Sequence, residues 1–346
     1  MKRDKDSLFV ASAALPPREY VLLVSGTMNP PHAGHVRLGI TAADGLCKMG
    51  HTVKAVCYVP VHDNYLCNKV MLKRKEKGTV SVVESIAFPI TERCELLKEL
   101  LARETSERAA ICHILDYEHH ATSLLAESPG YWAPKLPDGY LRTVPTAALI
   151  GSFAETSPLM QGGARLGVVF GVDNLAGMAS WNDPGQLLAR ADLVFLARAM
   201  PRVEVPKDPS ELLGALKHAD IGAAVPIVHG EAELLGGALG SFTNEGASGD
   251  SALFMLPPLE GDDESLSSTR IREALAEMVA TTAAASSVAA SDSGDGDAGA
   301  SAVTTLAQHG YDGASLDRLL GVVRQGEHVV NQMASAGRER GEWTSK

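Results

Sequence analysis

The sequence predicts an α/β fold built on a doubly wound, mostly parallel β-sheet. Three observations carry this prediction. Short apolar runs, which are typical of strands buried on both faces, recur along the chain. Segments with apolar residues spaced three or four positions apart, as in an amphipathic helix, stand between those runs. Two of the runs close directly in a glycine, at Gly26 and Gly171. Because parallel strands need a crossover between them, this alternation favours parallel pairing.

The first unit along the chain is predicted to consist of a strand, a turn, a helix and a second strand. Tyr20–Ser25 is the first apolar run, and two prolines follow it at a point where the first turn of a helix tolerates them. His32–Met49 is then predicted to be helical, with Gly50 suited to cap its end. Val53–Val61 is predicted to be the second strand, parallel to the first.

The remaining elements follow the same alternation. Ile90–Arg103 places its leucines on one face, which predicts an amphipathic helix with Thr91 as its N-cap. Ala110–Leu115 is a further short apolar run. Further strands are predicted at Leu166–Phe170, Asp192–Ala197 and Leu253–Leu256, and further helices at Pro184–Arg190, Thr269–Val279 and Leu316–Met333.

The composition limits the classes of partner. The chain has 346 residues, of which 45% are apolar, which suits one large domain with insertions or two domains. The formal net charge of −11 argues against broad binding of nucleic acid or of an anionic membrane, because both are negatively charged. Small phosphorylated ligands remain compatible with an acidic chain that gathers its cations locally. The oligomeric state stays open, with a homo-oligomer among the expectations.

The cysteines indicate a reducing compartment. There are five, an odd number, and none forms a C-x-x-C pair, which favours reduced thiols and a cytoplasmic or nuclear location. No apolar run approaches the roughly 20 residues that a membrane span needs.

The stretch SGTMNPPHAGH, from Ser25 to His35, carries the first candidate site. It joins the end of a predicted strand to the start of a predicted helix, where free backbone N–H groups favour an anion. His32 and His35 fall in the first helical turn and can face the same anion. A zinc site is the weaker interpretation, since such pairs usually stand four apart with a third ligand. A proline-rich turn with solvated histidines is the structural alternative.

A second stretch, SLSSTRIREAL from Ser265 to Leu275, has the same chemistry. Its three consecutive hydroxyls precede a predicted helix that carries Arg270 and Arg272. Hydroxyls at a helix start cap the helix or bind phosphate, and an arginine in the first turn adds a forked cation. The alternative is an ordinary serine-capped surface helix.

Together the two stretches resemble the signatures of the HxGH nucleotidyltransferases. Gly26–His35 looks like the family's G-[TS]-F-[ND]-P-x-H-x-G-H motif, with Met28 in place of phenylalanine. Ser267–Arg272 looks like its I-S-S-T-x-I-R motif, with Leu266 in place of isoleucine. The resemblance implies a Rossmann-like sheet of the nucleotidylyltransferase α/β phosphodiesterase type.

The middle of the chain resembles one branch of that family, the nicotinamide and nicotinate mononucleotide adenylyltransferases. Gly171-Val172-Asp173-Asn174-Leu175, then Trp181 and Arg198, is similar to their G-x-D-x-L…W…R pattern. Pro60–Tyr65 followed by Lys69 resembles the P-V-N-D-x-Y-x-K-K loop of the eukaryotic members, although three residues separate Tyr65 from Lys69 here. Tyr117-Glu118 resembles that group's W-E pair, with tyrosine in place of tryptophan.

The resemblance implies an activity and a set of roles. The chain would transfer AMP from ATP to nicotinamide or nicotinate mononucleotide, giving NAD+ or its deamido form and pyrophosphate, with Mg²⁺ accompanying ATP and no metal ligands from the protein. His35 and Arg272 would be catalytic. The ATP and phosphate contacts would be Ser25, Gly26, Thr27, His32, Lys69, Ser267, Ser268 and Thr269, and the pyridine mononucleotide contacts Tyr117, Gly171, Asp173, Trp181 and Arg198.

Two alternatives stay open. One is another HxGH transferase, such as a phosphopantetheine adenylyltransferase or a cytidylyltransferase, which shares both phosphate motifs. The other is a non-catalytic nucleotide-binding or chaperone-like protein on the same fold, because a fold alone does not prove an activity.

We expect four parts along the chain. The segment near 281–304 has almost no large apolar side chains, so it lacks the surface that ordering requires. The expected parts are a flexible leader at 1–19, with a targeting segment as its alternative; the nucleotidyltransferase catalytic domain at 20–280, with loop insertions near 128–145 and 200–250; a low-complexity, disordered insert at 281–304; and a C-terminal helical segment at 305–346 that packs on the catalytic domain.

Overall fold

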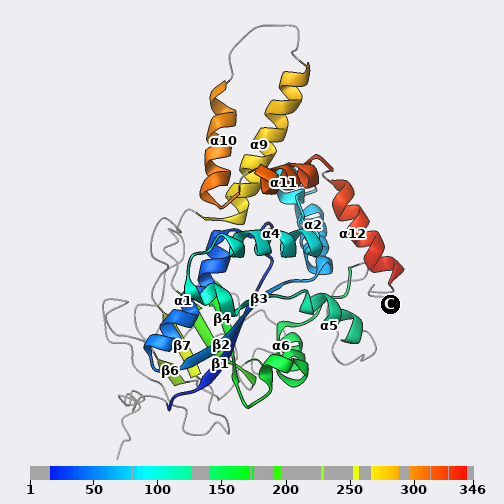
Figure 1. Cartoon of the computed structure of the whole chain (residues 1–346). Coiled ribbons are helices and arrows are strands. Elements are labelled where there is room, and N and C mark those ends of the chain that lie inside the picture. Colours follow the sequence, from blue (N-terminus) through cyan, green and yellow to red (C-terminus); the bar gives the residue numbers. More distant parts are fainter. Residues whose placement is uncertain are drawn as a thin grey trace, which may run out of the picture.

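A parallel sheet forms the centre of the protein (Figure 1). The structure is a computed structural model that describes residues 16–78, 81–125, 140–171, 174, 187, 190–196, 227–229, 252–256, 266–287, 296–311, 313–325 and 327–340. The sheet has seven strands in the order β3-β2-β1-β4-β5-β7-β6, and every neighbouring pair is parallel. The strands are β1 Glu19–Gly26, β2 Thr52–Pro60, β3 Cys112–Ile114, β4 Arg165–Gly171, β5 Asp192–Leu196, β6 Ile227–His229 and β7 Ala252–Leu256.

Helices cover both faces of the sheet, which makes it doubly wound. Strand β1 shows this most clearly, because its side chains alternate between two buried clusters. Val21 and Leu23 pack with residues of α5 and α6, while Leu22 and Val24 pack with residues of α1 and α4. The predicted fold class, an α/β Rossmann-like parallel sheet, is therefore confirmed. The chain order reverses between β1 and β4, the place where such sheets bind ligands.

The structure has more helices than the sequence pattern predicted. The α-helices are α1 Ala33–Lys48, α2 Asp63–Lys77, α3 Val82–Ser85, α4 Ile90–Ala102, α5 Tyr117–Leu125, α6 Thr146–Thr156, α9 Ser268–Ser287, α10 Gly296–Gln308, α11 Gly313–Gln325 and α12 Glu327–Glu339, and 3₁₀ turns occupy η1 Glu107–Ile111 and η3 Pro158–Met160. Within the described part of the chain, no helix is long and apolar enough to cross a membrane. All five cysteines are unbridged.

The predicted N-cap of α4 was wrong. The helix begins at Ile90, one residue before Thr91. A more distant group takes the capping role, because the Asp63 carboxylate accepts the backbone N–H of Ile90 over 2.8 Å. The signal for this cap lies 27 positions away along the chain, so a local pattern could not contain it.

Helices occupy both ends of the insert predicted near 281–304, and residues 288–295 lie outside the described part of the chain. Helix α9 continues to Ser287 and α10 begins at Gly296, and the two helices lie side by side as a hairpin (Figure 1). Alanine, the strongest helix former, is common in this segment. Ala302 and Leu306 of α10 are buried against Ile271 and Leu275 of α9, which supplies the apolar contact that composition alone did not show.

The last two helices pack against separate parts of the chain. Helix α11 contacts α9, and α12 contacts α2. Buried residues of α12, including Val330 and Met333, share a cluster with Leu66 and Val70 of α2. This contact places α2, which contains the basic run from Lys69 to Lys77, against the C-terminal part of the chain.

Candidate functional site

The loop from β1 to α1 lies at the carboxyl edge of the sheet, as predicted. Ser25 and Gly26 end β1 beside Val59 and Pro60 of β2, and the carbonyl oxygen of Gly26 accepts the N–H of Val61 over 3.0 Å. Thr27 then leaves the sheet and lines a cavity described below.

Met28 anchors this loop from inside the core. It has a left-handed backbone with φ of 44°, which costs a non-glycine residue about 1–2 kcal/mol. Its side chain is only 1% exposed and packs beside Val24 and Val36. Burying a methionine contributes roughly 1.5–3 kcal/mol, so packing offsets the backbone cost. A large apolar side chain is therefore what this position requires, and methionine supplies it.

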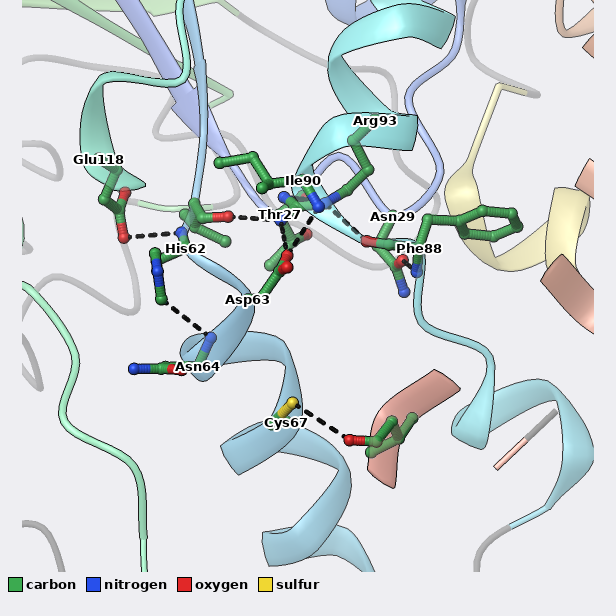
Figure 2. A network of polar contacts seen from close by, with 12 residues as sticks. Thr27, Asn29, His62, Asp63, Asn64, Cys67, Phe88, Ile90, Arg93 and Glu118 are labelled. Carbon is green, nitrogen blue, oxygen red and sulfur yellow. Dashed lines mark hydrogen bonds and ion pairs between the residues drawn. The ribbon is translucent and has the colours of Figure 1, made fainter. Parts of the chain in front are cut away.

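Asn29 binds the loop to the segment before α4. Its Nδ2 donates to the carbonyl oxygen of Ile86 over 2.9 Å. Its Oδ1 accepts the N–H of Phe88 over 2.8 Å (Figure 2). The amide thus satisfies a backbone acceptor and a backbone donor of one extended segment. Both partners are buried, so each bond would be costly to leave unmade.

Arg93 is the residue of this region that sequence reasoning missed. Its guanidinium is fully buried and donates to the carbonyl oxygens of Phe88, Thr27 and Val61 over 2.8, 2.9 and 2.6 Å (Figure 2). Its Nη2 also forms an ion pair of 2.8 Å with Asp63. One signal in the sequence could have indicated that Arg93 is buried: it stands three and four positions before Leu96 and Leu97, the buried leucines on the same face of α4. Arg93 thus joins the loops that follow β1 and β2.

The two histidines of the first motif have different environments. His32 is the N-cap residue of α1 and is 2% exposed, whereas His35 is partly exposed. Their ring centres are 3.8 Å apart, and Nδ1 of His35 accepts the backbone N–H of His32 over 3.1 Å. A Cβ atom at Gly34 would lie 3.0 Å from the His32 ring, so glycine allows this close packing. His35 is the better placed of the two to reach a ligand.

The second motif starts helix α9 as predicted, and it contacts the first motif directly. The Ser267 Oγ caps the helix by accepting the N–H of Arg270 over 3.1 Å. The Ser268 Oγ donates to the carbonyl oxygen of Pro30 over 2.7 Å. Two stretches that lie 238 positions apart in the chain are therefore in hydrogen-bond contact.

Arg272 strengthens this junction. Its Nη1 donates to the carbonyl oxygen of Asn29, and its Nε donates to that of Val83 over 3.1 Å. Its Nη2 donates to the Thr269 hydroxyl over 3.2 Å. The guanidinium also lines the cavity, where burial lowers its pKa. Arg272 therefore joins the two motifs and presents positive charge to the space between them.

The cavity lies between the β1–α1 loop, α2, the segment around α3 and the start of α9. Its volume is small, about 40 Å³, and it opens to solvent. Three cations face it, and Glu84 is the single carboxylate among its described lining residues. The lining consists of Thr27, Asn29, Leu66, Lys69, Val70, Lys73, Glu84, Ile86, Ala87 and Arg272.

The charges around this cavity favour an anionic ligand. Lys69 is exposed at its mouth, yet desolvation by neighbouring atoms, together with the charges of Lys73 and Arg272, lowers its pKa. Glu84 pairs with Lys77 over 2.8 Å and with Lys73 over 3.2 Å, and these bonds lower its pKa to about 2. The carboxylate of Glu84 is thus already neutralised, which leaves Lys69 and Arg272 to attract negative charge from outside.

The predicted pyridine site is only partly described. Gly171 ends β4 at the same sheet edge and is buried. Tyr117 lies at the start of α5, where its ring packs edge-on against Phe153, and its hydroxyl contacts those of Ser152 and Thr156 at 2.9 and 2.7 Å. Asp173, Trp181 and Arg198 lie outside the described residues. The roles predicted for these five positions stay predictions.

Glu118, beside Tyr117, is a buried carboxyl at this edge of the sheet. Its Oε1 accepts the backbone N–H of His62 over 3.0 Å (Figure 2). Burial raises its pKa to about 7, and the His62 N–H and the charge of Arg93 only partly oppose that rise. The ring of His62 stacks on that of His119 at 4.8 Å. Among the described residues, no cluster of His, Cys, Asp or Glu side chains has a geometry that could hold a metal ion.

Comparisons with known proteins give a weak structural likeness. No protein-family model matches the chain, and no curated protein matches it. Two solved structures of the nicotinic acid mononucleotide adenylyltransferase of Plasmodium falciparum superpose on it, each with a TM-score of 0.42. The structure complexed with APC is 10% identical in sequence, and the match covers 74% of this chain and 83% of the Plasmodium chain. The structure complexed with NaAD is 11% identical, and the match covers 75% of this chain and 84% of the Plasmodium chain. A likeness at this level carries no weight for the chemistry of this chain.

Proposed function

We propose that this chain is a nucleotidyltransferase that transfers AMP from ATP to a pyridine mononucleotide. The observation that carries the proposal is the contact between the two phosphate motifs. Ser268 and Arg272 of the second motif bond to the loop of the first, beside a cavity that Lys69 and Arg272 line. The junction lies at the carboxyl edge of a parallel sheet, where such folds bind nucleotides.

The chemistry needs few groups from the protein. An oxygen of the acceptor's phosphate attacks the α-phosphorus of ATP, and the bond from that phosphorus to the β-phosphate oxygen breaks, releasing pyrophosphate. The acceptor phosphate is already ionised at neutral pH, because its second pKa is about 6, so no general base is required. The protein has to align the two phosphates and stabilise the charge that develops between them.

The residues present suit those two tasks. His35 lies in the first turn of α1, where the helix dipole attracts a phosphate. Arg272 and Lys69 add a fixed guanidinium and an ammonium group. Losing one such transition-state contact typically costs about 10²–10³ in turnover. We assign His35 and Arg272 to the reacting phosphates and Lys69 to the leaving pyrophosphate.

Magnesium is expected to enter with ATP rather than to reside in the protein. The one carboxylate among the described cavity residues, Glu84, is paired with two lysines, so the chain offers no ready carboxylate ligand here. Bound to phosphate oxygens and water, the ion would neutralise charge on the triphosphate. For the acceptor we propose nicotinamide or nicotinate mononucleotide. The support is the sequence pattern that contains Gly171, Asp173, Trp181 and Arg198, together with the Tyr117-Glu118 pair.

The test is a product assay with purified protein, Mg²⁺ and ATP. Each pyridine mononucleotide is offered separately, with phosphopantetheine as the competing acceptor and CTP as the competing donor. We expect pyrophosphate and a dinucleotide with at least one pyridine mononucleotide. Product only with phosphopantetheine or only with CTP would replace the acceptor or the donor that we propose. Binding of ATP without any product would point to a non-catalytic nucleotide-binding protein.

Two variants with matched controls then test the residues. Arg272→Ala is paired with Arg270→Ala, since both arginines lie in the first turns of α9 but Arg270 is exposed. His35→Ala is paired with His113→Ala, an exposed histidine on the edge strand β3. We expect turnover to fall about 10²–10³-fold in the first member of each pair and to stay near the wild-type value in the second. Near-normal turnover of His35→Ala would remove His35 from the mechanism.

A further inference from the structure

His309 enters the phosphate-binding region from a part of the chain that neither motif contains. It follows the last residue of α10, where the chain returns toward the sheet. The N–H of Gly310 bonds to the carbonyl oxygen of Ala307, and the N–H of Tyr311 bonds to that of Leu306. These two bonds, with a left-handed Gly310 at φ of 93°, form a Schellman motif. The motif fixes the direction in which the His309 side chain points.

The contacts of His309 involve both phosphate motifs. Its Nε2 accepts the backbone N–H of Ser267 over 3.1 Å, directly before α9. Its own carbonyl oxygen accepts the N–H of Ala33, the first residue of α1, over 3.3 Å. Its ring lies edge-on to that of His32, with 6.0 Å between the ring centres. The residue is 1% exposed, so these contacts are shielded from water.

We propose that His309 is a positioning residue that holds the two phosphate motifs in register with each other. This inference rests on the proposed function, because it treats those motifs as the place where the phosphates react. A backbone bond fixes the start of α1, and a side-chain bond fixes the residue before α9. The reacting groups of both helices lie within two turns of these points, at His35 and at Arg272.

The bond to Ser267 requires a neutral imidazole of one tautomer. Nδ1 lies 2.7 Å from the carbonyl oxygen of Thr305, so this nitrogen carries the proton and donates. Nε2 is then left as an acceptor, which the N–H of Ser267 requires. Lysine and arginine have no acceptor atom and would fail at this position. Glutamine can place an amide oxygen near the Nε2 position, whereas asparagine reaches only as far as Nδ1.

The experiment compares His309→Gln, His309→Asn and His309→Ala with the wild type. His51 provides the matched control, because it is also a buried histidine whose Nδ1 accepts a backbone N–H, that of Arg18, but it precedes β2 at the opposite edge of the sheet. We expect kcat to fall at least about tenfold in H309N and H309A, since small misplacements of reacting groups cost about that much or more. H309Q should stay within about threefold of the wild type, and H51A should lose stability while keeping kcat.

Amide hydrogen exchange supplies a readout that does not depend on turnover. The Ser267 N–H should exchange slowly in the wild type and in H309Q, and faster in H309N. If H309N and H309A keep wild-type kcat, or if the Ser267 N–H of the wild type exchanges as fast as an exposed amide, His309 does not position the site. The second measurement needs no variant, so it decides the question even if the variants fail to fold.

Failure of the proposed function can be told apart from failure of this inference. A wild type that makes no product with any acceptor refutes the proposed function by itself. Titration with inorganic tripolyphosphate then replaces turnover as the measurement. Weaker binding by H309N than by H309Q would still support the positioning role, whereas equal binding by the wild type and H309N would overturn it.

Discussion

Arg93 offers the sharpest test of how the loop between β1 and α1 is held in place. The variant Arg93→Met keeps most of the side-chain volume on α4 but removes every donor and the charge. The guanidinium is 0% exposed, and it donates to three backbone carbonyl oxygens and to the carboxylate of Asp63. Removing one partner of a buried ion pair typically costs 3–5 kcal/mol, because the other charge stays buried. The Phe88 carbonyl is buried and those of Thr27 and Val61 are partly buried, so we expect the cost to fall within that range.

The assay is equilibrium unfolding in urea, with the free energy of unfolding obtained by linear extrapolation. Arg318→Met serves as the control, because Arg318 of α11 pairs with Glu99 of the same helix α4, over 3.1 Å, but is 35% exposed. Such exposed pairs contribute about 0–1 kcal/mol. A loss below about 1 kcal/mol in Arg93→Met, equal to that of the control, would refute the view that Arg93 holds the loop.

A double-mutant cycle isolates the ion pair from the other bonds of Arg93. Asp63→Asn keeps an oxygen that can accept the N–H of Ile90 at the start of α4, but it leaves the Arg93 charge without its partner. We expect the double variant Arg93→Met/Asp63→Asn to be more stable than the sum of the two single losses predicts, by about 1–3 kcal/mol. Strict additivity would show that the two charges do not interact.

Three further predictions follow from particular contacts. Glu84→Gln keeps the capping box with Ser81 but removes the carboxylate that pairs with Lys73 and Lys77. Tripolyphosphate should therefore bind the variant severalfold more tightly than the wild type in calorimetric titrations at low salt, and this gain should disappear at high salt. Unchanged affinity would contradict the role given to Glu84. Glu118 has a pKa of about 7 in the folded protein against an ordinary 4.5, so its burial lowers the free energy of unfolding as the pH rises from about 4.5 to 7. In urea unfolding, Glu118→Gln should therefore be as stable as the wild type at pH 4 and about 3 kcal/mol more stable at pH 8. A stability difference that does not depend on pH would contradict this prediction. Gly310→Ala should cost more than Gly50→Ala in the same assay, because both glycines have positive φ but only at Gly310 would a Cβ meet a neighbour, Leu100, at 2.6 Å; equal losses would show that the close contact is harmless.

The sequence predicted the central architecture well because its signals there are local. The elements β1, α1 and β2 each begin and end within two residues of the predicted bounds. Helix α9 begins at Ser268, one residue before the predicted start at Thr269. In each case an apolar run or a hydroxyl-rich cap marks the boundary within a few positions. The hydrogen bond from Ser268 to Pro30, which joins the two motifs, was not predicted.

The residues that sequence reasoning missed depend on contacts between distant parts of the chain. In the sequence, Arg93 is one charged residue in a predicted amphipathic helix. In the structure, the four oxygens that accept its hydrogen bonds come from three separate segments of the chain. His309 reads as a residue in a polar turn, and its partner Ser267 is 42 positions earlier. Helix α2 has few apolar residues, and part of its buried face packs against α12, more than 250 positions later. Local periodicity cannot report any of these.

The hairpin of α9 and α10 has both of its ends fixed at the same place, at Ser267 and His309. The length of chain between them is therefore free to vary without moving either phosphate motif, because the free energy of closing a loop changes by only about 0.6 kcal/mol for each doubling of its length. The hairpin is thus a place where the protein tolerates insertion of a tag or a whole domain, and where a circular permutant can take its new termini. We expect a change of length within the hairpin to leave its two anchor points, Ser267 and His309, in contact with each other.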